Sequence, residues 1–144
     1  MVSKNRQEKK SLSQNALLKW ASSTLNAKPT VDGKDSKIEF SFKAGGQYPL
    51  ECLVLAQESI AMLTVTGFAY LAIKSDKVDD VLKYCTKESS VAGVFSIANG
   101  ALVYIHSRSV ERDLDGIELI NSMISTMDEA VSSVAEGVLE ILKS

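Results

Sequence analysis

Residues 91–108 contain a two-residue turn signal between two apolar runs. Asn99 and Gly100 tolerate the positive φ that a type I′ hairpin turn requires, and β-prone residues lie on both sides of them. The pattern therefore predicts a β-hairpin. Its register pairs Ala98 with Ala101, Ile97 with Leu102, Phe95 with Tyr104 and Gly93 with His106. Both faces of this hairpin are apolar, so we expect other elements to cover it on both sides.

A second β signal is the strict alternation of apolar and polar residues in residues 37–43. Ile38, Phe40 and Phe42 point to one side, and polar or charged residues point to the other, as in a half-exposed antiparallel strand. Composition and glycine positions predict the neighbouring segments in the same way. We expect a loop at 29–36, a turn at Gly45-Gly46, strands at 50–56 and 60–66, a bulge or bend at Gly67 and an extended continuation at 68–73.

Helical spacing of apolar residues predicts two shorter helices. The first begins after Ser13 as its N-cap, with Leu12 and Leu17 spaced as a hydrophobic staple. The second is capped by Ser75 or Asp76. Its apolar residues recur at i, i+3, i+4 and i+7 and form one stripe. They are Val78, Val81, Leu82 and Cys85.

A third, longer helix is predicted to begin near Asp115. From Ile117 to Ile141 apolar residues recur at alternating intervals of three and four, and Leu119, Met123 and other residues widen the stripe on one flank. A wide stripe is typical of a helix that lies across a sheet, whereas a narrow one suits a coiled coil. We therefore expect this helix to pack on the sheet, with an additional helix–helix or dimer contact as the alternative.

The expected order is α–β–β–β–(β)–α–β–β–α. Strands and helices are clustered and do not alternate, which predicts an α+β fold with a mainly antiparallel sheet and helices packed on it. The polar, mostly charged residues 1–10 are expected to be a disordered tail, and residues 11–144 a single domain.

The charge of the chain is small but unevenly distributed. Residues 1–50 hold nine Lys and Arg against four Asp and Glu (+5), and residues 51–144 hold seven against fourteen (−7). This balance argues against nucleic-acid binding, which needs a basic surface. No apolar run approaches the ~20 residues of a membrane span, and the N-terminus lacks the pattern of a secretory signal. Two widely spaced cysteines, Cys52 and Cys85, suit a reducing compartment, so we expect a cytoplasmic protein without a membrane partner.

The sequence offers little for catalysis. It contains one histidine, His106, whereas nucleophilic catalysis and zinc sites both draw on clusters that include His. Paired carboxylates fall in helix first turns, charged loops or polar helix faces, and the glycines fit no phosphate-binding motif. We therefore expect no enzyme, no cofactor and no metal site.

The second half of the chain carries a family resemblance. Residues 77–142 contain a characteristic succession of elements. In chain order these are a short helix, a loop, a strand with Gly93 and Phe95, a tight turn, a strand with Tyr104, a polar corner with Leu114 and a long helix with Asp128 and Glu129. This succession resembles the YbjN-like family, which shares the type III secretion chaperone-like fold. The resemblance implies a non-catalytic, often dimeric module that binds a segment of a partner protein. It also implies a dimer contact on the second helix, at Val78, Val81, Leu82 and Cys85.

Two functions follow as hypotheses. The first is a chaperone-like or regulatory protein, a homodimer, that holds another protein or a peptide segment by apolar grooves and sheet-edge pairing. The candidate groove residues are Leu17, Trp20, Phe40 and Phe42. The alternative is a small-ligand sensor with a pocket between the sheet and the C-terminal helix, for which Ser96, Tyr104 and His106 are the available polar groups.

Overall fold

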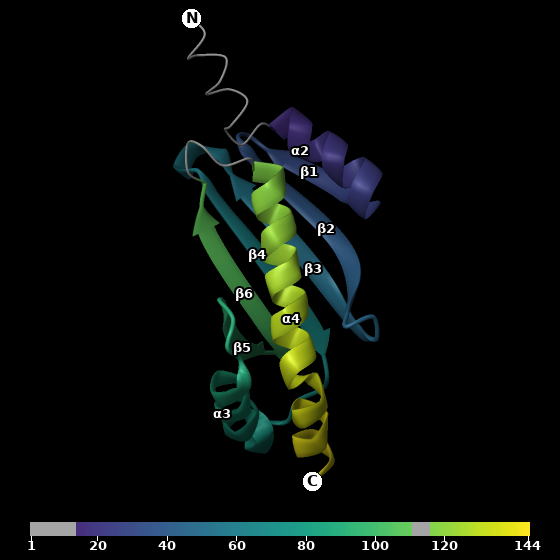
Figure 1. The fold of residues 1–144 in the computed structure, drawn as a ribbon, viewed down its shortest axis with the longest axis vertical. Coiled ribbons are helices and arrows are strands. Elements are labelled where there is room, and N and C mark those ends of the chain that lie inside the picture. Colours follow the sequence, from purple (N-terminus) through teal and green to yellow (C-terminus); the bar gives the residue numbers. More distant parts are fainter. Residues whose placement is uncertain (1–13, 111–115) are drawn as a thin grey trace, which may run out of the picture. The chain divides into compact units, whose positions relative to one another are not determined.

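The described residues form a six-stranded antiparallel sheet with three α-helices. The predicted α+β class is therefore confirmed (Figure 1). The computed structural model describes residues 14–110 and 116–144. The strand order in the sheet is β1-β2-β3-β4-β6-β5. The strands are β1 (Lys28–Asp32), β2 (Asp35–Ala44), β3 (Tyr48–Gln57), β4 (Met62–Tyr70), β5 (Val94–Ala98) and β6 (Ala101–Ser109).

The three predicted helices are present. They are α2 (Gln14–Trp20), which continues as a π-helical turn at Ala21–Leu25, α3 (Val78–Glu88) and α4 (Gly116–Lys143). The predicted cap at Ser13, its staple residue Leu12 and the tail 1–10 lie outside the described residues. The predicted cap of α3 is wrong, because Ser75 and Asp76 lie within a 3₁₀ turn (Ser75–Lys77) and no side chain caps α3.

The predicted loop at 29–36 is also wrong, because its first half belongs to the edge strand β1 and its last two residues begin β2. The strand pairs antiparallel with β2, and Val31 lies opposite Ser36 in that register. Gly33 and Lys34 form the two-residue turn between the strands, with Gly33 at a φ of 63°. Pro29 and the polar residues next to β1 are typical of an edge strand. The same residue types are typical of loops, so the sequence pattern does not distinguish this strand from a loop.

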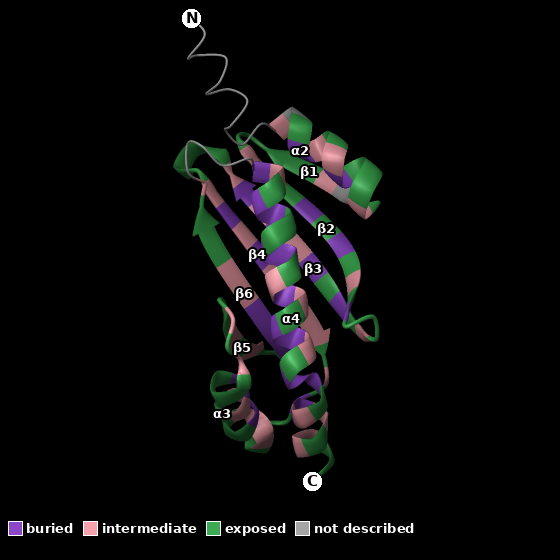
Figure 2. Cartoon of the chain, in the orientation of Figure 1, coloured by how far each residue is buried: buried purple, intermediate pink, exposed green. Residues whose placement is uncertain are grey.

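The alternation predicted for residues 37–43 is confirmed. Ile38 and Phe40 are buried, Phe42 is half-buried, and the polar residues between them are exposed (Figure 2). The turn at Gly45-Gly46 is present, and the next two strands correspond to β3 and β4. The predicted extended continuation joins β4 as far as Tyr70, so the optional strand is not a separate element.

The contacts of the chain divide it into two compact units. Unit 1 is the described part of Met1–Phe40 with Leu53–Val65 and Ser107–Ile124, and unit 2 is Ser41–Cys52, Thr66–His106 and Ser125–Ser144. Long strands and α4 therefore contribute residues to both units. The expectation of a single domain over 11–144 stays a prediction.

Unit 1 contains the first helix and its own set of buried side chains. Leu17 of α2 is 2% exposed, and the Gln14 side chain donates a hydrogen bond to the carbonyl of Gly33 over 2.9 Å. That bond ties the start of α2 to the β1–β2 turn. The other large buried side chains of this unit include Ile38, Phe40, Val54, Leu63, Val65, Ile120 and Met123.

The β5–β6 hairpin belongs to unit 2 up to His106, and its predicted register is confirmed over the paired residues of β5. Ala98 lies opposite Ala101, Ile97 opposite Leu102 and Phe95 opposite Tyr104. The expected cover on both sides is wrong for β5. Val94 is 66% exposed, because β5 is the last strand of the sheet and α3 packs only on the side of Phe95 and Ile97.

The second half of α4 carries the predicted stripe of unit 2. Met127, Val134 and Val138 are fully buried, and exposed residues alternate with them along the helix (Figure 2). The turn between β2 and β3 is held to this helix by a hydrogen bond of 2.7 Å from the Gly45 N–H to the Asp128 carboxylate. Within unit 2, the expected packing of this helix on the strands is therefore confirmed.

Replacing Gly93 should destabilise the protein strongly. Gly93 has a φ of 105°, and a Cβ there would overlap the ring of Tyr104, which is 1% exposed and cannot move aside. Backbone strain alone costs roughly 1–3 kcal/mol, and the overlap adds to it. We expect Gly93→Ala to lower the free energy of unfolding well beyond the control Gly46→Ala. Gly46 also has a positive φ of 75°, but nothing lies within 4 Å of its Cβ position.

Urea unfolding of the two variants measures the difference. Equal losses of stability would show that the Tyr104 ring does not confine Gly93.

Candidate functional site

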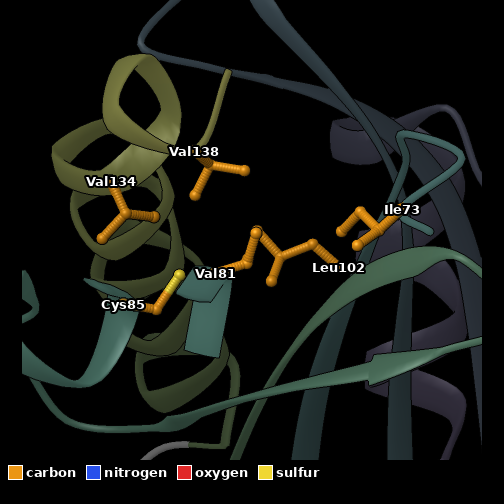
Figure 3. Close-up of a cluster of buried hydrophobic side chains, with 6 residues drawn as sticks. All are labelled: Ile73, Val81, Cys85, Leu102, Val134 and Val138. Atoms are coloured by element: carbon orange, nitrogen blue, oxygen red, sulfur yellow. The ribbon is translucent and has the colours of Figure 1, made fainter. Parts of the chain in front are cut away.

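A buried cluster joins α3 to α4 in unit 2. Val81 and Cys85 from α3 meet Val134 and Val138 from α4, and all four side chains are fully buried (Figure 3). Leu102 of β6 and Ile73 complete the cluster. The packing of α3 on α4 therefore depends on contacts within one chain.

The residues predicted to form a dimer contact lie mostly inside this cluster. Val81 and Cys85 are 0% exposed, and Val78 packs against the cluster as a partly buried residue. Leu82 is half-buried and does not belong to it. The chain itself covers the centre of the stripe, so a dimer contact there would rest on Val78 and Leu82 and stays a prediction.

Both cysteines are free, buried thiols. Burial raises the pKa of the Cys85 thiol from 9.0 to about 11. The pKa of the Cys52 thiol is raised from 9.0 to about 12, mainly by burial and to a smaller extent by the negative charge of Glu51. A thiol is nucleophilic only as a thiolate, so both side chains serve as apolar packing groups near neutral pH.

The polar groups proposed for a sensor pocket do not converge. Tyr104 is buried, and its hydroxyl donates a hydrogen bond to the Ala92 carbonyl over 2.6 Å. Its ring lies edge-on to His106, with 6.4 Å between the ring centres. Ser96 lies opposite Val103 and is therefore exposed on the other face of the hairpin. These three residues form no common site.

The four candidate groove residues also differ in position. Leu17 and Phe40 are 2% and 7% exposed and belong to the buried side chains of unit 1. Trp20 in unit 1 and Phe42 in unit 2 are half-buried. A partner could reach only the latter two without a rearrangement of the core, and their role in binding stays a prediction.

Unit 2 contains an apolar cavity of about 210 Å³ beside α4. Residues of β3, β4, β6 and α4 surround it. The exposed residues Pro49 and Tyr70 belong to its lining, so the cavity reaches the surface beside them. Tyr70 is 71% exposed. The full lining is Tyr48, Pro49, Leu50, Ala69, Tyr70, Leu71, Leu102, Val131, Ala135, Val138 and Leu139.

One polar pair lies at the cavity. Tyr48, which starts β3, has the carboxylate of Glu136 of α4 near its hydroxyl. Burial and then the interaction with the negatively charged Glu136 raise the pKa of the Tyr48 hydroxyl. A negatively charged carboxylate therefore lies next to Tyr48, which belongs to the otherwise largely apolar lining.

The alternative prediction from the sequence placed a pocket between the sheet and the C-terminal helix, but it missed the residues that line this cavity. Ala69 of β4 and Ala135 of α4 are small residues, and both line the cavity. The short side chains of Ala69 and Ala135 leave space between the strand and the helix, and this space is part of the cavity. The pattern of apolar positions alone does not distinguish a small residue in a tight core from one beside a cavity.

No metal site or membrane helix is found in the described part of the chain. Among residues 14–110 and 116–144 no group of three or more His, Cys, Asp or Glu side chains is arranged to hold a metal ion. No helix in the same ranges is long and apolar enough to cross a membrane.

Comparison with known proteins identifies no relative. No protein-family model matches the chain, and neither the curated proteins nor the solved structures provide a match. The resemblance to the YbjN-like family therefore stays a prediction.

The buried thiol of Cys85 should make the stability depend on pH. Because its folded-state pKa of about 11 lies above the ordinary 9.0, the stabilisation is fully present below pH 9 and is lost as the pH rises toward 11. We expect the free energy of unfolding to fall over this range, and Cys85→Ala to make the fall less steep. Urea unfolding at increasing pH measures both. Identical slopes in the two proteins would contradict a buried, protonated Cys85.

Proposed function

We propose that this chain is a non-catalytic binding protein that holds a segment of a partner protein, with the cavity beside α4 taking one large apolar side chain of that segment. The observation that carries the proposal is the cavity itself. It has a volume of about 210 Å³ and a mainly apolar lining, and it reaches the surface beside Pro49 and Tyr70. Anchors of protein interfaces are typically single aromatic or aliphatic side chains in such pockets.

The size of the cavity favours an anchor side chain. Sites for drug-sized ligands have volumes of roughly 300–1,000 Å³, whereas an apolar cavity of about 150 Å³ accepts benzene. A volume of about 210 Å³ therefore suits one ring or one branched alkyl group. The exposed Tyr70 at the rim provides the kind of surface that interfaces favour, because tyrosine is enriched there.

The charge at the rim indicates the chemistry next to the anchor. Glu136 lies against Tyr48, and residues 51–144 carry a net charge of −7. A basic residue beside the anchor would complement this charge and direct the register of the bound segment. The preferred segment therefore combines a large apolar residue with a neighbouring Lys or Arg.

This proposal is consistent with what the family resemblance implies. A type III secretion chaperone-like protein would be expected to bind a segment of another protein without catalysis. The cavity residues replace Leu17 and Phe40 as the binding site, because both of those side chains are buried in unit 1. A cytoplasmic location belongs to the same proposal and is supported by the two free thiols.

A small-ligand sensor is the second candidate, and the position of the cavity favours it. The cavity lies between strands of the sheet and the C-terminal helix, where that alternative places a pocket. Its polar group would be the Tyr48 hydroxyl with Glu136, since Ser96, Tyr104 and His106 do not line the cavity.

Defined peptides test the proposal. In a series that varies one central residue between flanking lysines, we expect peptides with Trp, Phe or Leu at the centre to bind and those with Ala or Gly to bind at least about tenfold more weakly, because an empty cavity forfeits the anchor energy. NMR titration should place the shifts at cavity residues such as Val131 and Ala135.

Matched variants control for the site. Ala135→Phe puts a ring into the cavity and should abolish peptide binding, whereas Ser133→Phe adds the same ring on an exposed face of α4 and should not. Glu136→Gln should weaken the binding of the lysine-flanked peptides and should not affect a peptide with the same central residue between flanking serines. If free apolar metabolites shift the cavity resonances and no peptide does, the sensor replaces the partner-binding proposal. If neither binds, both are wrong.

A further inference from the structure

The outer edge of β5 offers backbone groups without partners. In the β5–β6 hairpin, Val94, Ser96 and Ala98 lie at the positions that exchange hydrogen bonds with β6, which turns the N–H and C=O groups of Phe95 and Ile97 outward. β5 is the last strand of the sheet. No hydrogen bond within residues 14–110 and 116–144 reaches those four outward groups.

The two edges of the sheet differ in how they resist pairing. β1 contains Pro29 and the charged, exposed Asp32, and these features discourage the addition of a further strand. β5 has the sequence VFSIA, without charge or proline. Val94 is 66% exposed, and Ser96 and Ala98 are exposed as well. Of the two edges, only β5 is chemically open to another strand.

We propose that β5 pairs with β5 of a second copy of this chain, antiparallel and across a two-fold axis at Ser96. In this register Phe95 lies opposite the partner's Ile97, and Ile97 opposite the partner's Phe95. Both pairs are of the hydrogen-bonded type, so all four outward groups of each strand are satisfied by four hydrogen bonds. A two-fold axis at Phe95 or at Ile97 would leave half of them unpaired.

The side chains of β5 are self-complementary in the same register. Ser96 lies opposite Ser96 of the partner subunit, and the large, exposed Val94 lies opposite the small Ala98 of the partner subunit. No like charges meet, because the strand carries none. In this register each β5 strand meets an identical, uncharged strand, so the two surfaces fit each other. A foreign strand would find no charge on β5 that could fix its register. A second copy of this chain is therefore the favoured partner. The interface differs from the contact predicted on α3.

Cysteine cross-linking tests the register. Residues opposite each other in a non-hydrogen-bonded pair have Cα atoms about 4.5 Å apart, within the range for a disulfide. Ser96→Cys should therefore form a disulfide-linked dimer under mild oxidation. Val94→Cys alone should not, because its copies would lie about 13 Å apart along the strands. A mixture of Val94→Cys and Ala98→Cys should cross-link. The natural cysteines Cys52 and Cys85 are buried, so the unsubstituted protein shows how much cross-linking occurs without an introduced cysteine.

Sedimentation of the reduced proteins tests the association itself. We expect the full chain to dimerise between micromolar and millimolar concentration. Ser96→Asp places two like charges on the two-fold axis and should raise the dissociation constant about tenfold or more, whereas the neutral Ser96→Asn should not. A monomer at every concentration, or cross-linking of Ser96→Cys no faster than that of Val94→Cys, would overturn the proposal. No residue of β5 lines the cavity, so the peptide experiments stay independent of this outcome.

Discussion

The burial of α4 residues against α3 and the strands is the interaction on which unit 2 depends. Val134 and Val138 are fully buried, and they meet Val81 and Cys85 from α3 and Leu102 from β6. This contact uses the same face of α4 that continues toward the cavity through Val131 and Ala135. Changes along this face therefore affect folding as well as the proposed binding, which is why a binding test needs a control on the exposed face of the helix.

Elements with a strong periodic pattern could be predicted from the sequence. The alternation around Ile38 and Phe40 sets the buried face of β2, and Asn99-Gly100 fixes the register of the β5–β6 hairpin through the turn geometry. β1 escaped prediction because an edge strand is protected by the residues that mark loops, here Pro29 and its polar neighbours. The exposure of β5 depends on strand order, which no local pattern contains.

The candidate site could be predicted less well than the fold. A pocket between the strands and the C-terminal helix was one of two expectations, but the polar residues assigned to it were not those that line it. Ser96 and Tyr104 lie on opposite faces of the hairpin, as the period of two along a strand requires. The cavity itself is a deficit of side-chain volume shared by β3, β4, β6 and α4. Such a deficit depends on how four elements pack together. In the sequence it is indicated only by small residues such as Ala69 and Ala135.

The unfilled volume of the cavity lowers the stability of the fold. At about 24 cal/mol per Å³ of unfilled volume, a closed cavity of 210 Å³ would cost roughly 5 kcal/mol, which is comparable to the whole stability of many domains. Because the cavity reaches the surface beside Pro49 and Tyr70, the actual cost is smaller. Larger side chains at Ala69 or Ala135 would still remove much of it by simple substitutions. On the proposed function, this unfilled volume is the reason for binding, because an apolar side chain that enters from outside would recover part of that energy.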